Sequence, residues 1–426
     1  MKEEKNNKNK NQNQKKERKK AWQETTATVE EIQRFLEDHV MLRYNVVTRR
    51  VESLSPSPSP IREGNGWEPV TDRLVNSLWT EMSRDRQVRV QDIYRVLESD
   101  FVPEYHPFRF YLDSLPPWNG KDDYILELSS SVFVRGDVEE QMRFYEYLKK
   151  WLVAMVAAWI DDTVVNNVIL VLIGPQGSYK TTWFQYLLPP PLRQYFYTKT
   201  NAGRMSRDDL LTLAQYGLVC CEELDTMRPA ELNQLKAAVT MTAINERAAY
   251  AHFHEYRQHI ASFCGTGNNM QFLSDPTGNR RWLPFEVESI LSPRDHPFQY
   301  DGIYAQAYRL YREGFPFWFS QADIQRLTQH NRQFETPRLE AELVDIYFRK
   351  PAEHEQGEYM PVARALQIIG GSTTQKLSAV NIGRAFMDQG YKQLRRAYSR
   401  GYVVVQRDAQ EIHTRLQMMA TVTDDG

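Results

Sequence analysis

The sequence predicts an α/β protein whose core is a parallel sheet, preceded by a small α+β region and followed by a C-terminal domain of two helices and a β-hairpin. Two observations support the core. Short apolar runs occur at 168–173, 218–221 and 260–264, and such uninterrupted runs are typical of strands buried on both faces. A helical pattern follows the first run, and alternation of buried strands with helices indicates a parallel sheet.

Length and composition narrow the class of protein. The chain has 426 residues, of which 41% are hydrophobic, enough for two or three domains with buried cores. Its longest uncharged apolar runs, 151–160 and 164–173, are shorter than the ~20 residues that a membrane helix needs, so we expect no integral membrane protein. The N-terminus shows no apolar signal segment, and all three cysteines lie in apolar runs. We therefore expect reduced cysteines and a cytoplasmic protein.

Charge and pattern divide the chain into segments. The first twenty residues hold nine Lys/Arg and three Glu, whereas the remaining chain is net acidic. A tail so rich in Lys, Asn and Gln is expected to be disordered, either as a solvated leader or as a non-specific phosphate-binding arm. The expected segments are this tail at 1–22, an α+β region at 23–103 with a Ser/Pro linker at 53–66, a helical lead-in at 104–160, the α/β core at 161–335, a helix and linker at 336–358, and the C-terminal domain at 359–426.

Local patterns predict individual elements within these segments. Thr28 and Glu31 form a capping box for one helix, and Asp72 caps another. Residues 399–401 predict the turn of the C-terminal hairpin, and two helices followed by such a hairpin outline a winged helix. The expected elements are helices at 28–40, 72–84, 90–98, 139–159, 180–188, 304–313, 320–334, 338–349 and 378–387, and a strand at 42–52.

The strongest motif is VILVLIGPQGSYKTT at 168–182, a strand followed by a glycine-containing turn and a helix start. A phosphate-binding loop needs backbone N–H groups at a helix N-terminus. It also needs a lysine for the β- and γ-phosphates and a hydroxyl for Mg²⁺. Lys180 and Thr181 stand at those two positions. The predicted nucleotide-binding residues are Gly174, Pro175, Gln176, Gly177, Ser178, Tyr179, Lys180, Thr181 and Thr182.

The loop departs at one position from the usual pattern GxxxxGK[ST]. Tyr179 stands where glycine is usual, and the missing Cβ of glycine normally lets such a loop close on the phosphates. We expect Tyr179 to adopt a helix-compatible backbone with its ring turned outward. A plain glycine turn between a strand and a helix is the alternative interpretation of the segment.

Carboxylates follow the second buried run, in QYGLVCCEELD at 215–225. One acid at the end of a strand can hold Mg²⁺, and the next can orient and polarise the attacking water. We assign Glu222 to the metal and Glu223 to the water, and the reverse assignment stays open. Asp225 is a third candidate that is better suited to capping a helix or turn.

Polar residues also follow the third run. Asn268, beside Thr266, can hydrogen-bond the γ-phosphate or the attacking water, although Gly-Asn pairs are common in turns. The string DPTGNRRW then brings Arg280 and Arg281, one of which would act as an arginine finger on a neighbouring subunit's nucleotide. In an extended segment the two arginines would point to opposite faces, so we expect only one to be catalytic. A structural pair with Asp275 is the alternative.

The motifs GPQGSYKTT, EELD, GTGN and DPTGNRRW, in this order, resemble the virulence-associated protein E family of P-loop ATPases over residues 105–287. The whole chain is similar to versions found in Bacteroidales mobile elements. The resemblance implies an AAA+-like fold similar to superfamily 3 helicases and to phage- and plasmid-type primase-helicases. It also implies ATP and Mg²⁺ as cofactors, hexameric homo-oligomers, and single- or double-stranded DNA as partner. Residues before the core are too few for a primase domain, so a separate primase or other replication proteins are further candidate partners.

The resemblance also indicates where DNA would bind. In superfamily 3 rings a hairpin before the third motif faces the central channel, and the matching stretch is 245–259, where cations alternate with aromatic residues. The DNA-binding candidates are Arg247, His252, His254 and Arg257, with Lys236 as a weaker one. A solvated hairpin with core aromatics is the alternative. The basic C-terminal wing would bind duplex DNA or pack against another subunit.

We therefore expect a DNA-dependent ATPase, a hexameric superfamily 3-like DNA helicase that serves replication of a phage, plasmid or genomic island. Tyr179 favours an alternative, in which an ATP-binding ring clamps DNA as a switch or defence-related assembly without productive unwinding. A third hypothesis is a repressor or scaffold that uses the C-terminal domain alone.

Overall fold

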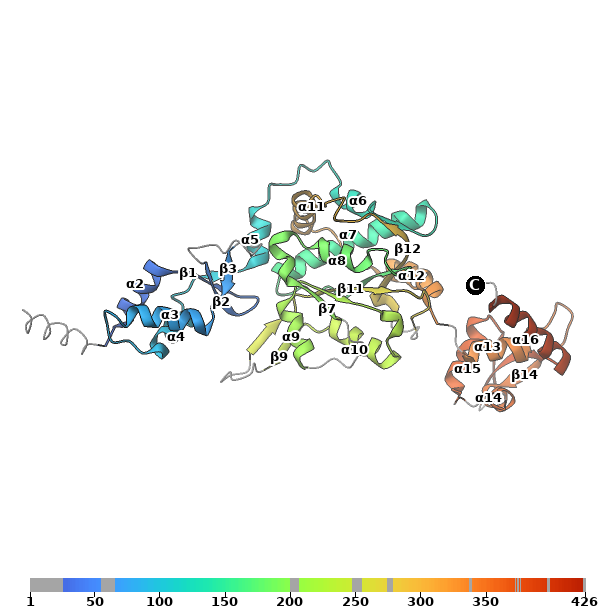
Figure 1. The fold of residues 1–426 in the computed structure, drawn as a ribbon. Coiled ribbons are helices and arrows are strands. Elements are labelled where there is room, and N and C mark those ends of the chain that lie inside the picture. Colours follow the sequence, from blue (N-terminus) through green and yellow to red (C-terminus); the bar gives the residue numbers. More distant parts are fainter. Residues whose placement is uncertain are drawn as a thin grey trace, which may run out of the picture. The chain divides into compact units, whose positions relative to one another are not determined.

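The computed structural model describes residues 26–54, 66–199, 207–246, 255–273, 279–336, 339–371, 373, 375, 377–396 and 399–423. The chain divides into two compact units, Met1–Phe334 and Glu335–Gly426 (Figure 1). Within the described ranges no helix is both long and apolar enough to cross a membrane. The expected disordered tail and most of the Ser/Pro linker lie outside the described residues.

A six-stranded sheet forms the centre of the first unit. Its strand order is β5-β12-β6-β11-β8-β7. The last five strands run parallel, and the short edge strand β5 is antiparallel to β12. The strands are β5 (Val132–Val134), β12 (Trp282–Ile290), β6 (Ile169–Ile173), β11 (Ser262–Gly267), β8 (Leu218–Cys221) and β7 (Phe196–Lys199). The predicted α/β class with a parallel sheet is confirmed, and the three predicted strands correspond to β6, β8 and β11.

Strand β12 is not among the strands that the sequence predicted. Its sequence contains a proline, which disfavours a central strand. Pro284 pairs with Val171 of β6, whereas β5 pairs with β12 only from Val287 onward. At Pro284 the strand therefore pairs with β6 only. On its other side no strand is paired with it, so the missing N–H of proline costs no sheet hydrogen bond there.

Two hydrophobic cores cover the two faces of this sheet. Leu170 and Leu172 of β6 pack with α7, α8 and α11, while the alternate residues Ile169, Val171 and Ile173 pack with α9 and α10, as the two-residue period of a strand requires. Figure 1 shows α7 and α8 on one side of the sheet and α9 and α10 on the other. The helices are α7 (Val138–Ile160), α8 (Lys180–Leu187), α9 (Arg207–Gln215), α10 (Pro229–Val239) and α11 (Tyr300–Arg312).

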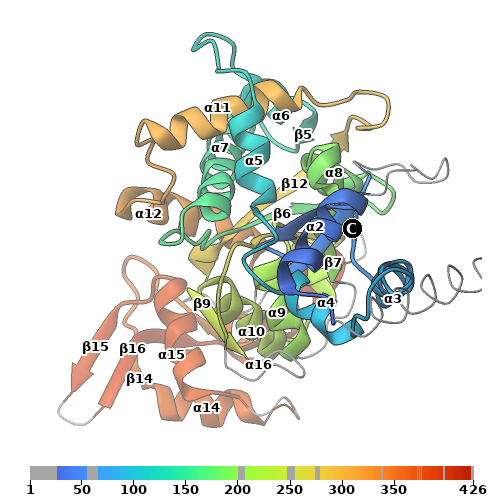
Figure 2. The ribbon, with the colours of Figure 1, turned by 90° about the vertical axis from the view of Figure 1, so that its left-hand side faces the viewer.

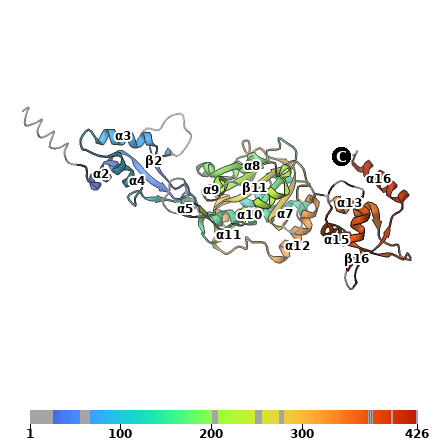
Figure 3. The same ribbon diagram turned by 90° about the horizontal axis from the view of Figure 1, so that it is seen from below.

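The N-terminal region combines three helices with a small sheet of order β3-β2-β1-β4. Its elements are α2 (Val29–His39), β1 (Met41–Asn45), β2 (Arg50–Leu54), β3 (Trp67–Pro69), α3 (Asp72–Met82), α4 (Val90–Leu97) and β4 (Glu104–Tyr105). The three helices pack together around a shared core, and Figure 3 shows them grouped beside β2. The capping box of Thr28 and Glu31 is confirmed. The second helix is capped by Thr71 rather than by Asp72, which is its first residue.

The single strand expected at 42–52 is wrong. Strands β1 and β2 form an antiparallel hairpin in which Asn45 pairs with Arg50. Arg49, in the turn, takes a left-handed backbone with φ 54°. The alternating pattern misled the prediction because both arms of a short hairpin share it, and no glycine or proline marks the turn.

Short helices complete the first unit. They are α5 (Pro107–Ser114), α6 (Tyr124–Ser129), η1 (Pro190–Tyr195), η2 (Leu224–Thr226), η3 (Asn279–Arg281), α12 (Gln321–His330) and η4 (Asn331–Phe334). The helix expected at 320–334 therefore ends at His330 and continues as a tighter 3-10 turn. A two-stranded hairpin, β9 (Ala243–Glu246) with β10 (Glu255–Gln258), lies outside the main sheet.

The C-terminal unit begins with a helix and ends with one. Its elements are α13 (Leu339–Tyr347), β13 (Phe348–Arg349), β14 (Glu358–Pro361), α14 (Val362–Gly370), α15 (Ala379–Asp388), β15 (Gln393–Arg396), β16 (Ser399–Gln406) and α16 (Ala409–Thr423). Strand β16 pairs with β13, β14 and β15, and Figure 2 shows the hairpin of β15 and β16 beside β14. The turn predicted at 399–401 is wrong, because Ser399 already pairs with Arg396. The helix predicted at 338–349 ends at Tyr347.

A buried polar contact joins the N-terminal region to the central sheet. The Asn45 amide Nδ2 donates to the Tyr195 hydroxyl and to Glu52 Oε1, both at 2.7 Å. Asn45 is fully buried, and Tyr195 is 1% exposed. A buried amide that loses an acceptor retains its desolvation penalty, so this contact fixes the packing of β1 beside the start of β7.

We predict that Tyr195→Phe lowers the free energy of unfolding by about 1–3 kcal/mol, because it leaves one Asn45 N–H without its acceptor. Tyr197→Phe, on the adjacent strand β7, is the matched control and is expected to change little. Thermal unfolding and hydrogen exchange of β1 and β2 measure the effect. Equal behaviour of the two variants would contradict this role for the contact.

Candidate functional site

The loop between β6 and α8 has several features that would suit a bound phosphate. It leaves the sheet at Gly174, whose N–H donates to Gly267 O of β11 at 3.1 Å. A Cβ on Gly174 would lie 2.8 Å from Val287 O, so only glycine fits there. Gly177 has φ +85°, a conformation that glycine adopts without strain. The loop ends at the N-terminus of α8, where backbone N–H groups favour an anion.

The side chain of Lys180 lies inside this loop. Its Nζ donates to Gly174 O and Pro175 O, both at 2.7 Å, and lies 3.3 Å from Ser178 Oγ. The residue is 7% exposed. Burial lowers the pKa of Lys180, and the carboxylate of Asp225 opposes that shift. The loop thus holds a cation at its centre by its own carbonyl oxygens, which an anionic phosphate could replace as partners.

The expectation of a helix-compatible backbone for Tyr179 is wrong. Tyr179 is the N-cap of α8 and has φ 60° and ψ 13°, in the left-handed region, which costs about 1–2 kcal/mol for a residue with a Cβ. The residue is 45% exposed, in accord with the expected outward side chain. The position therefore demands the backbone that makes glycine usual there, and the tyrosine adopts it under strain.

The two acidic residues after β8 differ in their contacts. Glu222 accepts a hydrogen bond from the Thr181 hydroxyl, with 2.9 Å between Oγ1 and Oε1. Glu223 has a left-handed backbone with φ 54° and precedes the short helix η2. Of the three non-glycine residues with positive φ in the described chain, Tyr179 and Glu223 both line one pocket. Strain of this kind gathers at functional sites.

The third polar segment is held by Asp225. Its carboxylate accepts the backbone N–H groups of Asn268 and Asn269 at 3.2 and 3.1 Å. A Cβ on Gly267 would lie 3.1 Å from the same carboxylate. Asp225, in the loop after β8, thus caps the loop after β11. The sequence suggested only a local helix or turn cap for Asp225 and did not predict this link between the two loops.

These segments form one pocket of about 410 Å³ at the edge of the sheet where β6, β8 and β11 end. Ligands of α/β proteins bind at this edge. The lining residues are Gln176, Gly177, Ser178, Tyr179, Lys180, Thr181, Thr182, Glu222, Glu223, Thr266, Gly267 and Asn268. The structure therefore brings together the predicted loop, the acidic pair and Asn268. Gly174 and Pro175 shape the loop from behind.

The donor set fits Mg²⁺ bound together with a phosphate ligand. Thr181 and Glu222 supply oxygen atoms, which Mg²⁺ prefers, and they lie within hydrogen-bond distance of each other. Among the described residues no group of three or more His, Cys, Asp or Glu side chains is placed to hold a metal. A site with one carboxylate and one hydroxyl depends on ligand oxygens to complete the octahedron.

The structure does not bring Arg280 and Arg281 to this pocket. They lie in η3, a 3-10 turn, so the reasoning from an extended segment is wrong. Trp282 directly after them pairs with Ile169 at the start of β6, whereas the loop to α8 follows Ile173 at its end. The arginines are therefore at the opposite edge of the sheet, roughly 13 Å away along the strands.

A chain of polar contacts fixes the segment that carries these arginines. The fully buried Asn331 amide donates to Asn279 O and Trp282 O at 2.8 and 3.0 Å. Asn331 follows α12, whose His330 contacts Glu140 of α7 at 2.6 Å. No local sequence signal marked Asn331, because its partners lie about fifty residues earlier in the chain.

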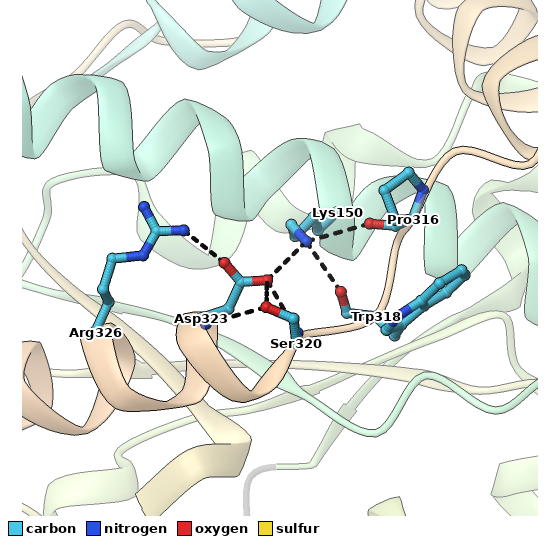
Figure 4. Close-up of polar contacts among 6 residues, drawn as sticks. All are labelled: Lys150, Pro316, Trp318, Ser320, Asp323 and Arg326. Carbon is cyan, nitrogen blue, oxygen red and sulfur yellow. Dashed lines mark hydrogen bonds and ion pairs between the residues drawn. The ribbon is translucent and has the colours of Figure 1, made fainter.

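Helix α12 is itself anchored to α7 by Lys150 (Figure 4). Lys150 Nζ donates to Pro316 O, Trp318 O and Asp323 Oδ2 at 3.2, 2.9 and 3.2 Å. Asp323 also accepts from Ser320 and from Arg326. Burial alone would raise the pKa of Asp323, but these hydrogen bonds outweigh it and hold the pKa well below its usual range.

Two of the DNA-binding candidates are described by the structure, and both are buried. Lys236 on α10 and Arg257 on β10 are each 7% exposed, which disfavours direct contact of either side chain with DNA. Arg247, His252 and His254 lie outside the described residues. The strands β9 and β10 that flank them form an antiparallel hairpin, with Glu246 paired to Glu255.

The family comparison covers this region. The family described as virulence-associated protein E-like domain matches residues 112–336, which is more than half of the chain. The chain belongs to this family. The predicted resemblance to the virulence-associated protein E family is thereby confirmed. No curated protein matches the chain.

Solved structures provide more distant likenesses to this virulence-associated protein E-like chain. It is similar to three apo structures of the NrS-1 C-terminal region, at 11%, 12% and 12% sequence identity. The TM-scores are 0.47, 0.44 and 0.42, and each comparison covers 88% of this chain and 98% of the other.

We predict that Tyr179→Gly is more stable than Tyr179→Ala by about 1 kcal/mol in free energy of unfolding, the reverse of the usual order, because φ near 60° penalises a Cβ. Urea unfolding of both variants measures the difference. The pair Ser178→Gly and Ser178→Ala is the control and should keep the usual order, with alanine the more stable. An alanine advantage at both positions would refute strain at Tyr179.

We also predict a pH dependence at α12. The pKa of Asp323 is lower in the folded than in the unfolded chain, so its stabilising contribution is present above the unfolded pKa of about 4 and is lost as pH falls through the folded pKa. Asp323→Asn should therefore lower the melting temperature at pH 7, and the gap to the wild type should narrow below about pH 4. A gap that stays constant down to the acid limit would contradict this.

Proposed function

We propose that this chain is a DNA-dependent ATPase, working as a hexameric, superfamily 3-like DNA helicase in the replication of a phage, plasmid or genomic island. The observation that carries the proposal is the single pocket in which Lys180 lies at a helix N-terminus and Thr181 contacts Glu222. A lysine, a hydroxyl and an acid in this arrangement are the parts of a nucleoside triphosphate site. Membership of the virulence-associated protein E-like family supports it.

Each side chain would have a distinct role. The N–H groups of the loop and Lys180 would bind the β- and γ-phosphates of ATP, Thr181 and Glu222 would hold Mg²⁺, and Glu223 would orient the attacking water. Bound Mg²⁺ would neutralise charge on the phosphate oxygens. Asn268, held by Asp225, would hydrogen-bond the γ-phosphate or that water. Positioning and charge neutralisation would supply most of the rate.

The position of Arg280 and Arg281 supports a ring. They stand at the sheet edge opposite the pocket of their own chain, so these arginines would complete a nucleotide site on another subunit rather than the one on their own chain. In the proposed AAA+-like ring, Asn331 would hold one of them toward the neighbour's nucleotide, where an arginine finger contributes about 10³–10⁵ in turnover. A separate primase would be a further partner.

The alternative function is an ATP-binding ring that clamps DNA, as a switch or defence-related assembly, without productive unwinding. The left-handed Tyr179 favours it, because strain at the loop would oppose the small movements of a turnover cycle. A strand-displacement assay separates the two. A helicase unwinds a forked duplex in the presence of ATP, whereas a clamp shifts the same duplex without separating its strands.

We predict that Lys180→Ala lowers DNA-stimulated ATP hydrolysis by about 10²–10³-fold, since it removes a preorganised charge from the phosphate site. Lys121→Ala removes the same charge from an exposed position outside the pocket and is expected to leave turnover unchanged. Phosphate release with and without single-stranded DNA is the measurement. Full turnover by Lys180→Ala would overturn the site, and nucleotide binding without turnover by the wild type would favour the clamp.

A further inference from the structure

Basic side chains are concentrated in one part of the C-terminal unit. Between Arg384 and Arg407 the sequence has six Lys/Arg and a single acidic residue, Asp388, although residues 335–426 as a whole hold equal numbers of Lys/Arg and Asp/Glu. Four of the six belong to the hairpin of β15 and β16 or directly precede it. They are Lys392, Arg395, Arg396 and Arg400.

The hairpin places like charges opposite each other. Arg395 of β15 pairs with Arg400 of β16, and like charges at directly opposed positions destabilise a sheet. Both residues are exposed, as is Lys392. Among the described residues, the ion pairs of this unit join Arg349 and Arg415 to acids and none reaches the hairpin. The repulsion is thus uncompensated within the described part of the unit, as expected of a surface that meets an external anion.

The hairpin is held firmly to its unit. Strand β16 pairs with β14, and its residues Tyr402 and Val404 are buried in the core. The Arg396 guanidinium lies 4.2 Å from the ring centroid of Tyr359 on β14, an attractive cation–π contact. The basic side chains therefore start from a preorganised strand pair, which lowers the entropy lost on binding.

We propose that the hairpin of β15 and β16, with Lys392, binds the phosphate backbone of duplex DNA, as a second DNA-binding surface that is independent of ATP. A two-stranded ribbon fits the major groove of B-form DNA, and arginines and lysines on such a ribbon contact the phosphates on either side. Uncompensated positive charge on an exposed ribbon thus favours duplex DNA over an apolar protein face. The surface belongs to the second compact unit, whereas the proposed ATP site belongs to the first. A failure of one proposal therefore leaves the other untouched.

The test uses the full chain, without nucleotide and with EDTA, and a fluorescent 25-base-pair duplex in anisotropy titrations over a salt series. Arg395→Ala and Arg400→Ala are each expected to weaken duplex binding severalfold and to reduce the slope of log K against log salt by about 0.9. Lys121→Ala is the matched control. It removes one positive charge from an exposed position in the other compact unit and is expected to leave duplex affinity and salt slope unchanged.

Further variants make each outcome decisive. Arg395→Lys keeps the charge and is expected to keep most of the affinity and the full salt slope, which shows that a loss in Arg395→Ala is not unfolding. Because the titrations contain no nucleotide and include EDTA, duplex binding is expected to be the same whether or not ATP hydrolysis is found. Wild-type duplex affinity and slope in Arg395→Ala and Arg400→Ala would overturn the proposal. A loss confined to single-stranded DNA, or a change in oligomeric mass with unchanged duplex binding, would overturn it equally.

Discussion

The candidate site depends on the position of β11 between β6 and β8. Parallel strands end at the same edge of a sheet, so this order brings three loops from distant parts of the chain within contact of one another. The hydrogen bond from Gly174 N–H to Gly267 O joins the first residue after β6 to the end of β11. The contact of Thr181 with Glu222 then closes the pocket across that strand. Removing β11 from this order would separate the loop from its acids.

Strain and close packing concentrate around the same pocket. Tyr179 and Glu223 have left-handed backbones, and Lys180 is buried among carbonyl oxygens of its own loop. Each arrangement is unfavourable locally and persists because the sheet and α8 hold the flanking residues. A loop in this state has partners that an entering anion could replace, which would give the proposed nucleotide binding a physical means of moving the sheet edge.

The opposite edge of the sheet has a different kind of support. The arginines of η3 are positioned by Asn331, and α12 before it is tied to α7 by His330 with Glu140 and by Lys150 with Asp323. These contacts connect the long helix under the sheet to the segment that would face another subunit. Because they are buried or half-buried and made by charged groups, losing one partner leaves a desolvated charge behind. These contacts hold the edge in place, as the proposed action of an arginine on a neighbouring site would require.

The sequence by itself determined the α/β class, the strands β6, β8 and β11, the helix α7 and the loop between β6 and α8 as a candidate site, because each depends on local periodicity or on a contiguous motif. Tertiary structure decided the rest. β12 contains a proline at a point where the strand pairs only with β6. Tyr179 takes a left-handed backbone that no local pattern indicated. Asp225 and Asn331 contact segments between 43 and 52 residues away. Such contacts leave no local pattern, since their partners are brought together only when the sheet forms.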